Sequence, residues 1–291
     1  MKKSLNLLTF LTVALLQPLL GADQVLKING STTVNLAAAE AAENLRAEKK
    51  LNIQIDTQGG SSGGISSLGD GLVQIGMISK PLSGEDRAKY PKCDFRVTEI
   101  GVDAVALIVS QDVWDGGVHS LSKQQVRDIY ESRITNWKDV GGKDQRIAFF
   151  NKEPGRGTWE VFANWAYVDH KKAPEVSFPE VGGNEETRSK VSSTKGALSQ
   201  LSASWADGKT VFALGLKDDA GTVVEPVNAN IANHTYPMSR PLSLITNGEP
   251  TGDAKTFVDY LLSEKGQALM TKNGYLPLKD LHGEAPAATV K

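Results

Sequence analysis

The chain has 291 residues and a formal net charge of −2 at pH 7, with 40% hydrophobic and 23% charged residues. This composition is ordinary for a soluble globular protein, and the length allows two domains on a prior of about 100–200 residues each. The small net charge excludes a global field that would attract nucleic acid or an anionic membrane, so we expect no nucleic-acid partner. Any positive charge that binds an anion must be local.

The first residues have the layout of a secretory signal peptide, which we place at residues 1–22. A basic start, Met1-Lys2-Lys3, precedes a mostly apolar run over 6–20, and Gly21-Ala22 supply small residues. The run is shorter than the roughly 20 residues of a membrane-spanning helix, and the alternative is a buried N-terminal helix. Cys93 is the only cysteine, so no intrachain disulfide can form and we expect no lipid anchor near the cleavage site.

Strand and helix signals alternate along the rest of the chain. We expect strands at 24–30, 51–58, 73–79, 102–110 and 146–151, and an extended segment at 236–246. We expect helices at 35–50, 65–71 and 122–132, a helix after 158, a loop with a short surface helix at 182–194, and amphipathic helix within 253–278. Ser122 and Gln125 form a capping box at the start of one helix. The alternation indicates α/β architecture with largely parallel sheets.

Three turns rich in Gly, Ser and Thr each lie between a predicted strand and a helix start. They occupy 30–33, 59–64 and 155–158, and each offers hydroxyl groups, free backbone N–H groups and the positive end of a helix dipole. In open α/β sheets such turns lie at the carboxyl ends of strands, where ligands bind. Arg156 and Lys152 add positive charge to the third turn. We therefore expect the three turns to surround one small, multiply charged oxyanion.

Two other functions compete with anion binding. Residues 59–63 match the G-x-S-x-G nucleophile elbow, which would make the protein an exported phosphatase or other hydrolase with Ser61 or Ser62 as nucleophile. That chemistry also needs a positioned histidine and acid, and none of the four histidines lies in a motif that suggests a base. The second alternative is an interaction protein whose cleft binds no small ion. The sequence has no Walker loop and no His/Cys metal spacing, so we expect no cofactor and no metal.

Several segments resemble one known family, in the same order along the whole mature chain. They are "NGSTTV", "TQGGSSGGISSL", "VQIGMISKPLS", "VRDIYESRITNWKDVGG", "GRGT", "YPMSRPL" and "GQALMTKNGYLPL". The chain resembles the periplasmic phosphate-binding proteins of ABC phosphate transporters, the PstS-like proteins of the type II substrate-binding family. The segments "ITNWKDVGG" and "YPMSRPL" are the most specific, and we interpret them as packing segments rather than ligand-binding ones.

The resemblance implies a periplasmic binding protein type II fold, with two α/β domains joined by two crossover hinge strands. Domain I would comprise 23–103 and 236–291, and domain II would comprise 104–235. It also implies a monomeric, periplasmic binding protein, not an enzyme, that captures inorganic phosphate in the interdomain cleft and delivers it to an ABC transporter permease. A different tetrahedral oxyanion is the alternative ligand.

The resemblance assigns the ligand shell residue by residue. The first two turns and a position before Pro-Leu supply hydroxyls, and the family's third turn typically reads Arg-x-x-Gly-Ser-Gly-Thr where this chain has residues 152–158. The implied ligand-binding residues are Ser31, Thr32, Thr33, Ser61, Ser62, Ser79, Lys152, Arg156, Gly157 and Thr158.

The third turn departs from the family pattern at two positions. Lys152 replaces the family arginine, and Arg156 replaces a serine. Arg156 could supply the guanidinium from a new place, the ligand could have changed, or the Arg156 side chain could point to solvent.

Ser79 raises a separate question about selectivity. That position is acidic in some members, and a carboxylate there favours a protonated ligand and repels sulfate, which carries no proton. If an acceptor comes from elsewhere, Glu153 and Asp56 are the candidates, although each is also an ordinary loop carboxylate.

Overall fold

The computed structural model describes residues 25–281, so the predicted signal peptide over 1–22 lies outside the described residues. The strands are β1 (Leu26–Gly30), β2 (Ile53–Asp56), β3 (Ile75–Ile78), β4 (Phe95–Ser110), β5 (Ser120–Ser122), β6 (Ala148–Lys152), β7 (Glu180–Val181), β8 (Ala197–Ser202), β9 (Val211–Lys217), β10 (Val223–Val224) and β11 (Ser239–Asn247). The α-helices are α1 (Thr32–Lys49), α2 (Gly60–Gly69), α3 (Gly84–Lys89), α4 (Gln111–Trp114), α5 (Lys123–Tyr130), α6 (Gly157–Tyr167), α7 (Asn184–Ser193), α8 (Asn228–Ala232), α9 (Gly252–Leu262) and α10 (Glu264–Lys272).

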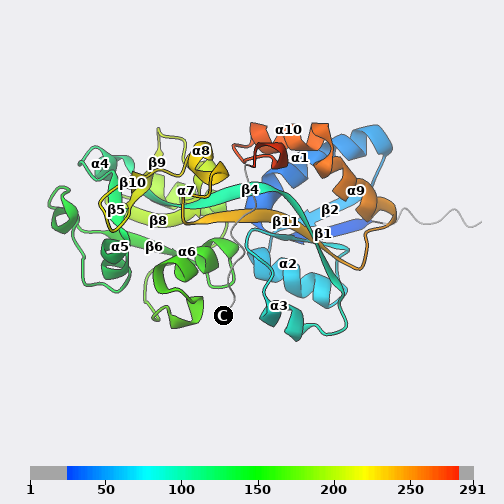
Figure 1. The fold of residues 1–291 in the computed structure, drawn as a ribbon, viewed down its shortest axis with the longest axis horizontal. Helices are drawn as coiled ribbons and strands as arrows, with labels where there is room; N and C mark the ends of the chain where they lie inside the picture. The colour runs from blue at the N-terminus through cyan, green and yellow to red at the C-terminus, as the bar shows by residue number, and fades with distance from the viewer. Residues whose placement is uncertain (1–24, 282–291) are drawn as a thin grey trace, which may run out of the picture.

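These elements form two lobes (Figure 1). The first lobe contains β1–β3, α1–α3, α9 and α10, and the second contains β5–β10 and α4–α8. Strands β4 and β11 run from one lobe into the other, and the strand order along the sheet is β2-β1-β3-β11-β4-β8-β6-β7. The predicted fold, two α/β lobes with two crossover strands, is confirmed.

The long strand β4 belongs to both lobes. It pairs with β11 from Phe95 to Ala104, and from Val105 to Val109 it pairs with β8 instead. Each lobe has its own core: Ile28, Ala41 and Ile75 are buried in the first, and residues such as Phe162 and Leu214 are buried in the second. Along β4 the cores change a little earlier, since Ile100 belongs to the first core and Val102 and Ala104 already belong to the second.

The expectation of largely parallel sheets is wrong for the crossover strands. β1 pairs in parallel with β2 and β3, and β6 pairs in parallel with β7 and β8. Every pairing of β4 or β11 with another strand is antiparallel. The two strands cross between the lobes in opposite directions, so they pair with each other antiparallel.

Two helices begin earlier than the sequence pattern predicts, because polar and glycine residues form their first turns. α1 begins at Thr32, where the Ser31 hydroxyl accepts from the N–H groups of Thr33 at 3.2 Å and Val34 at 3.4 Å. α2 begins at Gly60 rather than at 65. A Cβ on Gly64 would lie 2.9 Å from carbonyl oxygens of β1 and β3, so only glycine lets this helix approach the sheet so closely.

The predicted capping box of α5 is confirmed. The Ser122 hydroxyl accepts from the Gln125 N–H at 3.2 Å, and the Gln125 side chain accepts from the Ser122 N–H at 2.9 Å. The amphipathic segment near the C-terminus divides at Ser263 into α9 and α10. Within residues 25–281, no helix has the length and apolar composition of a membrane span.

Candidate functional site

A small cavity lies between the two lobes, and its lining contains all the predicted ligand residues except Ser62. The lining residues are Ser31, Thr32, Thr33, Gly60, Ser61, Ser79, Lys152, Arg156, Gly157, Thr158, Gly182 and Asn184. The backbone N–H of Ser62 instead donates to the Gly155 carbonyl at 3.1 Å, which joins the second and third turns at the edge of the cavity.

Four helices start at this cavity. The first residues of α1, α2, α6 and α7 all belong to the lining, two helices from each lobe. A helix start carries unpaired N–H groups and a partial positive charge, so four of them pointing at one cavity favour a negative ligand. The three predicted turns are thus brought together, and the start of α7 joins them.

Ser79 joins the hydroxyls of the first lobe. It accepts from the Ser31 hydroxyl at 2.9 Å, and its own N–H donates to Ser61 Oγ at 3.1 Å. Gly157, the first residue of α6, packs directly on this group. A Cβ on Gly157 would lie 2.7 Å from Ser61 Oγ and 2.8 Å from the Ser79 carbonyl oxygen, so a side chain there would force the lobes apart.

The Arg156 side chain lies against the cavity and is only 15% exposed. Its Nε and Nη2 donate to Glu153 Oε2 at 2.9 and 2.7 Å. It lies over Gly60, where an added Cβ would come within 2.7 Å of Arg156 Cδ. The alternative in which the side chain points to solvent is therefore wrong.

Lys152 also lines the cavity, but its ammonium is already hydrogen-bonded to oxygens around the start of α7. Nζ contacts the carbonyl oxygens of Gly182 at 2.9 Å and Gly183 at 3.1 Å, Asn184 Oδ1 at 3.3 Å and Thr187 Oγ1 at 2.6 Å. Burial, and then the charges of Arg156 and Arg240, hold the pKa of this ammonium well below its ordinary value. A bound anion would offset those charges.

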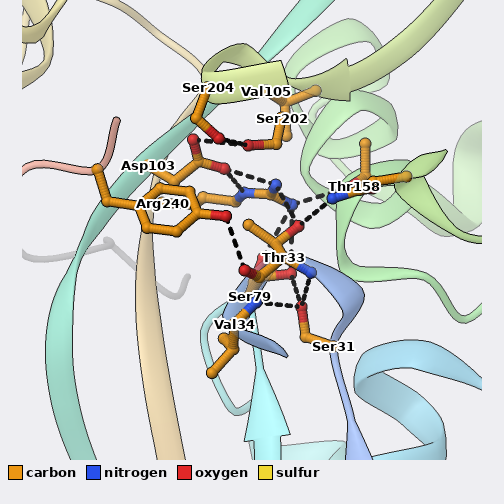
Figure 2. Close-up of polar contacts among 12 residues, drawn as sticks. Ser31, Thr33, Val34, Ser79, Asp103, Val105, Thr158, Ser202, Ser204 and Arg240 are labelled. Atoms are coloured by element: carbon orange, nitrogen blue, oxygen red, sulfur yellow. Dashed lines mark hydrogen bonds and ion pairs between the residues drawn. The ribbon is translucent and has the colours of Figure 1, made fainter. Parts of the chain in front are cut away.

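Arg240 is the main site residue that sequence reasoning missed (Figure 2). Its fully buried guanidinium donates to Asp103 Oδ2 at 3.1 and 2.7 Å. It also donates to Thr158 Oγ1 at 2.9 Å, to Ser79 Oγ at 3.3 Å and to Thr33 Oγ1 at 3.2 Å. The sequence pattern favours packing for the segment "YPMSRPL"; the available signal is a single arginine at a position that is buried within β11.

Asn184, at the start of α7, is the second missed residue. Its Nδ2 donates to Thr33 Oγ1 at 3.0 Å, which links the second lobe to the first. The sequence placed this region in a polar loop with a surface helix, and nothing local indicated that its first residue faces the cavity.

Neither of the candidate carboxylate acceptors lines the cavity. Asp56 is exposed, and its Oδ1 accepts from the N–H groups of the next two residues at 2.6 and 3.1 Å. Glu153 is paired with Arg156. Within the described lining there is no Asp, Glu or His, so a hydrolase using Ser61 has no carboxylate or histidine base beside it. In the same part of the chain, no group of three or more His, Cys, Asp or Glu could hold a metal ion.

A larger cavity, of about 410 Å³, lies far from these groups at the outer end of the first lobe. Its described lining includes Leu68, Pro250, Glu249 and Asp253 and contains no Lys or Arg. It is therefore unsuited to an anion, whereas the cavity between the lobes offers cations, hydroxyls and N–H groups.

Comparison with known proteins gives consistent matches. A family model described as a PBP superfamily domain matches residues 20–265. The phosphate-binding protein PstS of Bacillus subtilis is 31% identical over 258 residues, which are 88% of this chain and 81% of the relative. A solved candidate phosphate ABC transporter substrate-binding protein with bound phosphate, from Clostridium perfringens, is 30% identical with a TM-score of 0.77, covering 88% of this chain and 100% of that chain. An ABC-type phosphate transport receptor from Vibrio cholerae is 27% identical with a TM-score of 0.67, covering 86% and 99%.

Proposed function

The chain belongs to the PBP superfamily and, within it, to the PstS phosphate-binding proteins, and from this membership we propose that it captures inorganic phosphate in the cavity between its lobes. It is a solute-binding protein of an ABC transporter, not an enzyme. The observation that carries the proposal is the convergence of four helix starts, a ring of hydroxyls and Arg156 on one cavity that has no carboxylate in its described lining. Such groups can replace the hydration shell of a tetrahedral oxyanion.

We propose that the lobes act as two hinged domains, 23–103 with 236–291 and 104–235, which close on the ligand. Strands β4 and β11 would be the hinges, because they are the strands that pass between the lobes. Closure removes water from the cavity, and each hydrogen bond to the anion then counts for more. In this scheme the signal peptide exports the protein to the periplasm, where it has no lipid anchor. The closed monomer then docks on a transporter permease.

The first test is the Arg156→Ala variant. Losing a charge-assisted hydrogen bond costs about 1.5–3 kcal/mol, so we expect phosphate affinity to fall by roughly 10- to 100-fold. The measurement is calorimetric titration of the ligand-stripped full chain. Arg96→Ala is the matched control, because Arg96 is 53% exposed and does not line the cavity.

Wild-type and variant titrations separate two failures. If both proteins bind phosphate equally, the Arg156 side chain is not a ligand. If the wild type gives no heat and no thermal stabilisation with phosphate, the proposed function itself is wrong.

A further inference from the structure

Arg240 lies behind the cavity, and its contacts reach groups of both lobes. It extends from β11, is 1% exposed, and touches Thr33 and Ser79 of the first lobe and Thr158 of the second (Figure 2). Arginine has five N–H donors and no acceptor, so every one of these hydroxyls receives a hydrogen bond from it. The direction of those bonds decides whether each hydroxyl can still donate to a ligand or accept a hydrogen bond from it.

Two hydroxyls of the cavity have both acceptor positions filled. A hydroxyl has one O–H donor and two acceptor lone pairs. Thr33 Oγ1 accepts from Arg240 at 3.2 Å and from Asn184 at 3.0 Å. Ser79 Oγ accepts from Arg240 at 3.3 Å and from Ser31 at 2.9 Å. What remains to Thr33 for a ligand is its proton, whereas the Ser79 hydroxyl also lies 3.4 Å from Ser61 Oγ, to which it can donate.

Thr158 is also bound by Arg240, which fills one of its two acceptor positions. Its Oγ1 accepts from Arg240 at 2.9 Å, and among the described residues neither Thr158 nor Thr33 donates its hydroxyl proton to another group. Both residues belong to the cavity lining. Their O–H groups are therefore free to donate to a bound anion.

The carboxylates nearest the cavity are engaged elsewhere. Asp103 accepts two bonds from Arg240, and Glu153 accepts two from Arg156. Glu186 accepts from a backbone N–H in the loop before α7 at 2.9 Å. Since none of the three belongs to the described lining, the cavity has no carboxylate that could accept a proton carried by the ligand.

We propose that Arg240 is a positioning residue that orients the hydroxyls of Thr33, Ser79 and Thr158, and that the cavity, which has no carboxylate acceptor in its described lining, binds tetrahedral dianions whether or not they carry a proton. Sulfate would then be a ligand as well as phosphate. The inference rests on the proposed function and specifies its ligand class. A site built to accept a ligand's proton rejects the analogue without it by roughly 10⁴-fold, and this cavity has no such device.

The decisive experiment compares the two anions on the full wild-type chain. Calorimetric titrations with inorganic phosphate and with sulfate are made below and above the pH of phosphate's second ionisation. Protein groups such as Lys152 can change both affinities with pH, but these changes act on both anions and largely cancel in the ratio of the two affinities. We expect sulfate within about tenfold of phosphate at the higher pH, and a phosphate-to-sulfate ratio that rises with pH as phosphate loses its proton.

The outcomes separate this inference from the proposed function. Tight phosphate binding with no response to sulfate overturns the inference and leaves the phosphate receptor intact. A phosphate preference that is greatest at the lower pH also overturns it, because it requires an acceptor. Failure of both anions to bind overturns the proposed function as well.

Two variants test the role of Arg240 and of the missing acceptor. Arg240→Lys keeps a charge but cannot donate to all three hydroxyls, so freed lone pairs can accept a ligand proton. We expect sulfate to weaken more than phosphate, whereas a purely structural role would weaken both equally. Arg96→Lys is the exposed control.

The second variant, Ser79→Asp, adds a carboxylate beside Arg240. We expect it to weaken sulfate relative to phosphate by about 100-fold or more. An unchanged ratio in a variant that thermal unfolding shows to be folded would contradict the role assigned to the missing carboxylate.

Discussion

At the scale of single residues, Lys152 is an ammonium group in a place that disfavours its charge. It is 1% exposed, and the positive charges of Arg156 and Arg240 add to the effect of burial in lowering its pKa. A lysine with a lowered folded pKa binds fewer protons than the unfolded chain at any pH between the two pKa values. The free energy of unfolding must therefore rise with pH across that range.

We expect Lys152→Met to flatten this rise in the anion-free protein. The measurement is urea unfolding of both proteins between neutral pH and about pH 9, below the range in which ordinary tyrosines and lysines titrate. Lys138→Met is the control, because Lys138 is 54% exposed. If the wild type and Lys152→Met give the same slope of stability against pH, Lys152 keeps its proton in the folded state.

The sequence predicted the site residues that lie in local signals and missed those that depend on the tertiary fold. Ser31, Ser61 and Thr158 lie in Gly/Ser/Thr turns next to helix starts, and such turns can be recognised without the structure. Arg240 reaches the cavity only because β11 lies between β3 and β4, far from the turns in sequence. No local sequence pattern predicts the direction in which the Arg240 side chain points.

At the scale of elements, a buried ion-pair group joins the two lobes beside the cavity. Lys80, which follows β3, contacts Asp86 of α3 at 2.8 Å and Glu160 of α6 at 2.7 Å, and its side chain is 3% exposed. Burial lowers the pKa of Lys80, but the two carboxylates outweigh it and leave the pKa above its ordinary value. The contact with Glu160 exists only while α6 lies against the first lobe.

We expect Glu160→Gln to lower phosphate affinity by about tenfold without altering the cavity, because it leaves a buried cation with one partner in the closed form. The matched control is Glu85→Gln. Glu85 on α3 pairs with Lys171 of the second lobe, but these side chains are 62% and 53% exposed.

An exposed ion pair contributes little to the stability of the closed form, so Glu85→Gln should change phosphate affinity by less than about fivefold. Calorimetric titration checks both variants. Equal losses would mean that burial of the Lys80 group adds nothing to closure.

One strand that the sequence pattern does not predict has a polar sequence in a buried place. β8 reads Ala-Leu-Ser-Gln-Leu-Ser, which suggests no strand, yet all of its residues are buried. The Gln200 side chain is satisfied by Asn151 Oδ1 at 3.1 Å and by the Lys152 N–H at 3.1 Å. Partners from another strand make this burial possible, and they cannot be read from the segment alone.

At the scale of the whole molecule, the second lobe is continuous in sequence and the first is not. We expect a shortened chain of residues 104–235 to fold by itself, because its core is formed mostly by residues within that range. A shortened chain of residues 23–103 should not fold, since it lacks β11 and the helices α9 and α10. Circular dichroism during thermal unfolding checks both. A cooperative transition for 23–103, or none for 104–235, would contradict the proposed domain boundaries.

Synthesis from the N-terminus delivers the strands of the first lobe at very different times. β1 to β4 leave the ribosome early, but β11, which lies between β3 and β4, follows only after the whole second lobe has been made. Until Asn247 has emerged, β3 and β4 have unpaired edges that other chains can join. During synthesis there is therefore a long interval in which the second lobe is complete and the first lobe still lacks β11. The interval ends when the last fifth of the chain, which contains β11, has been made.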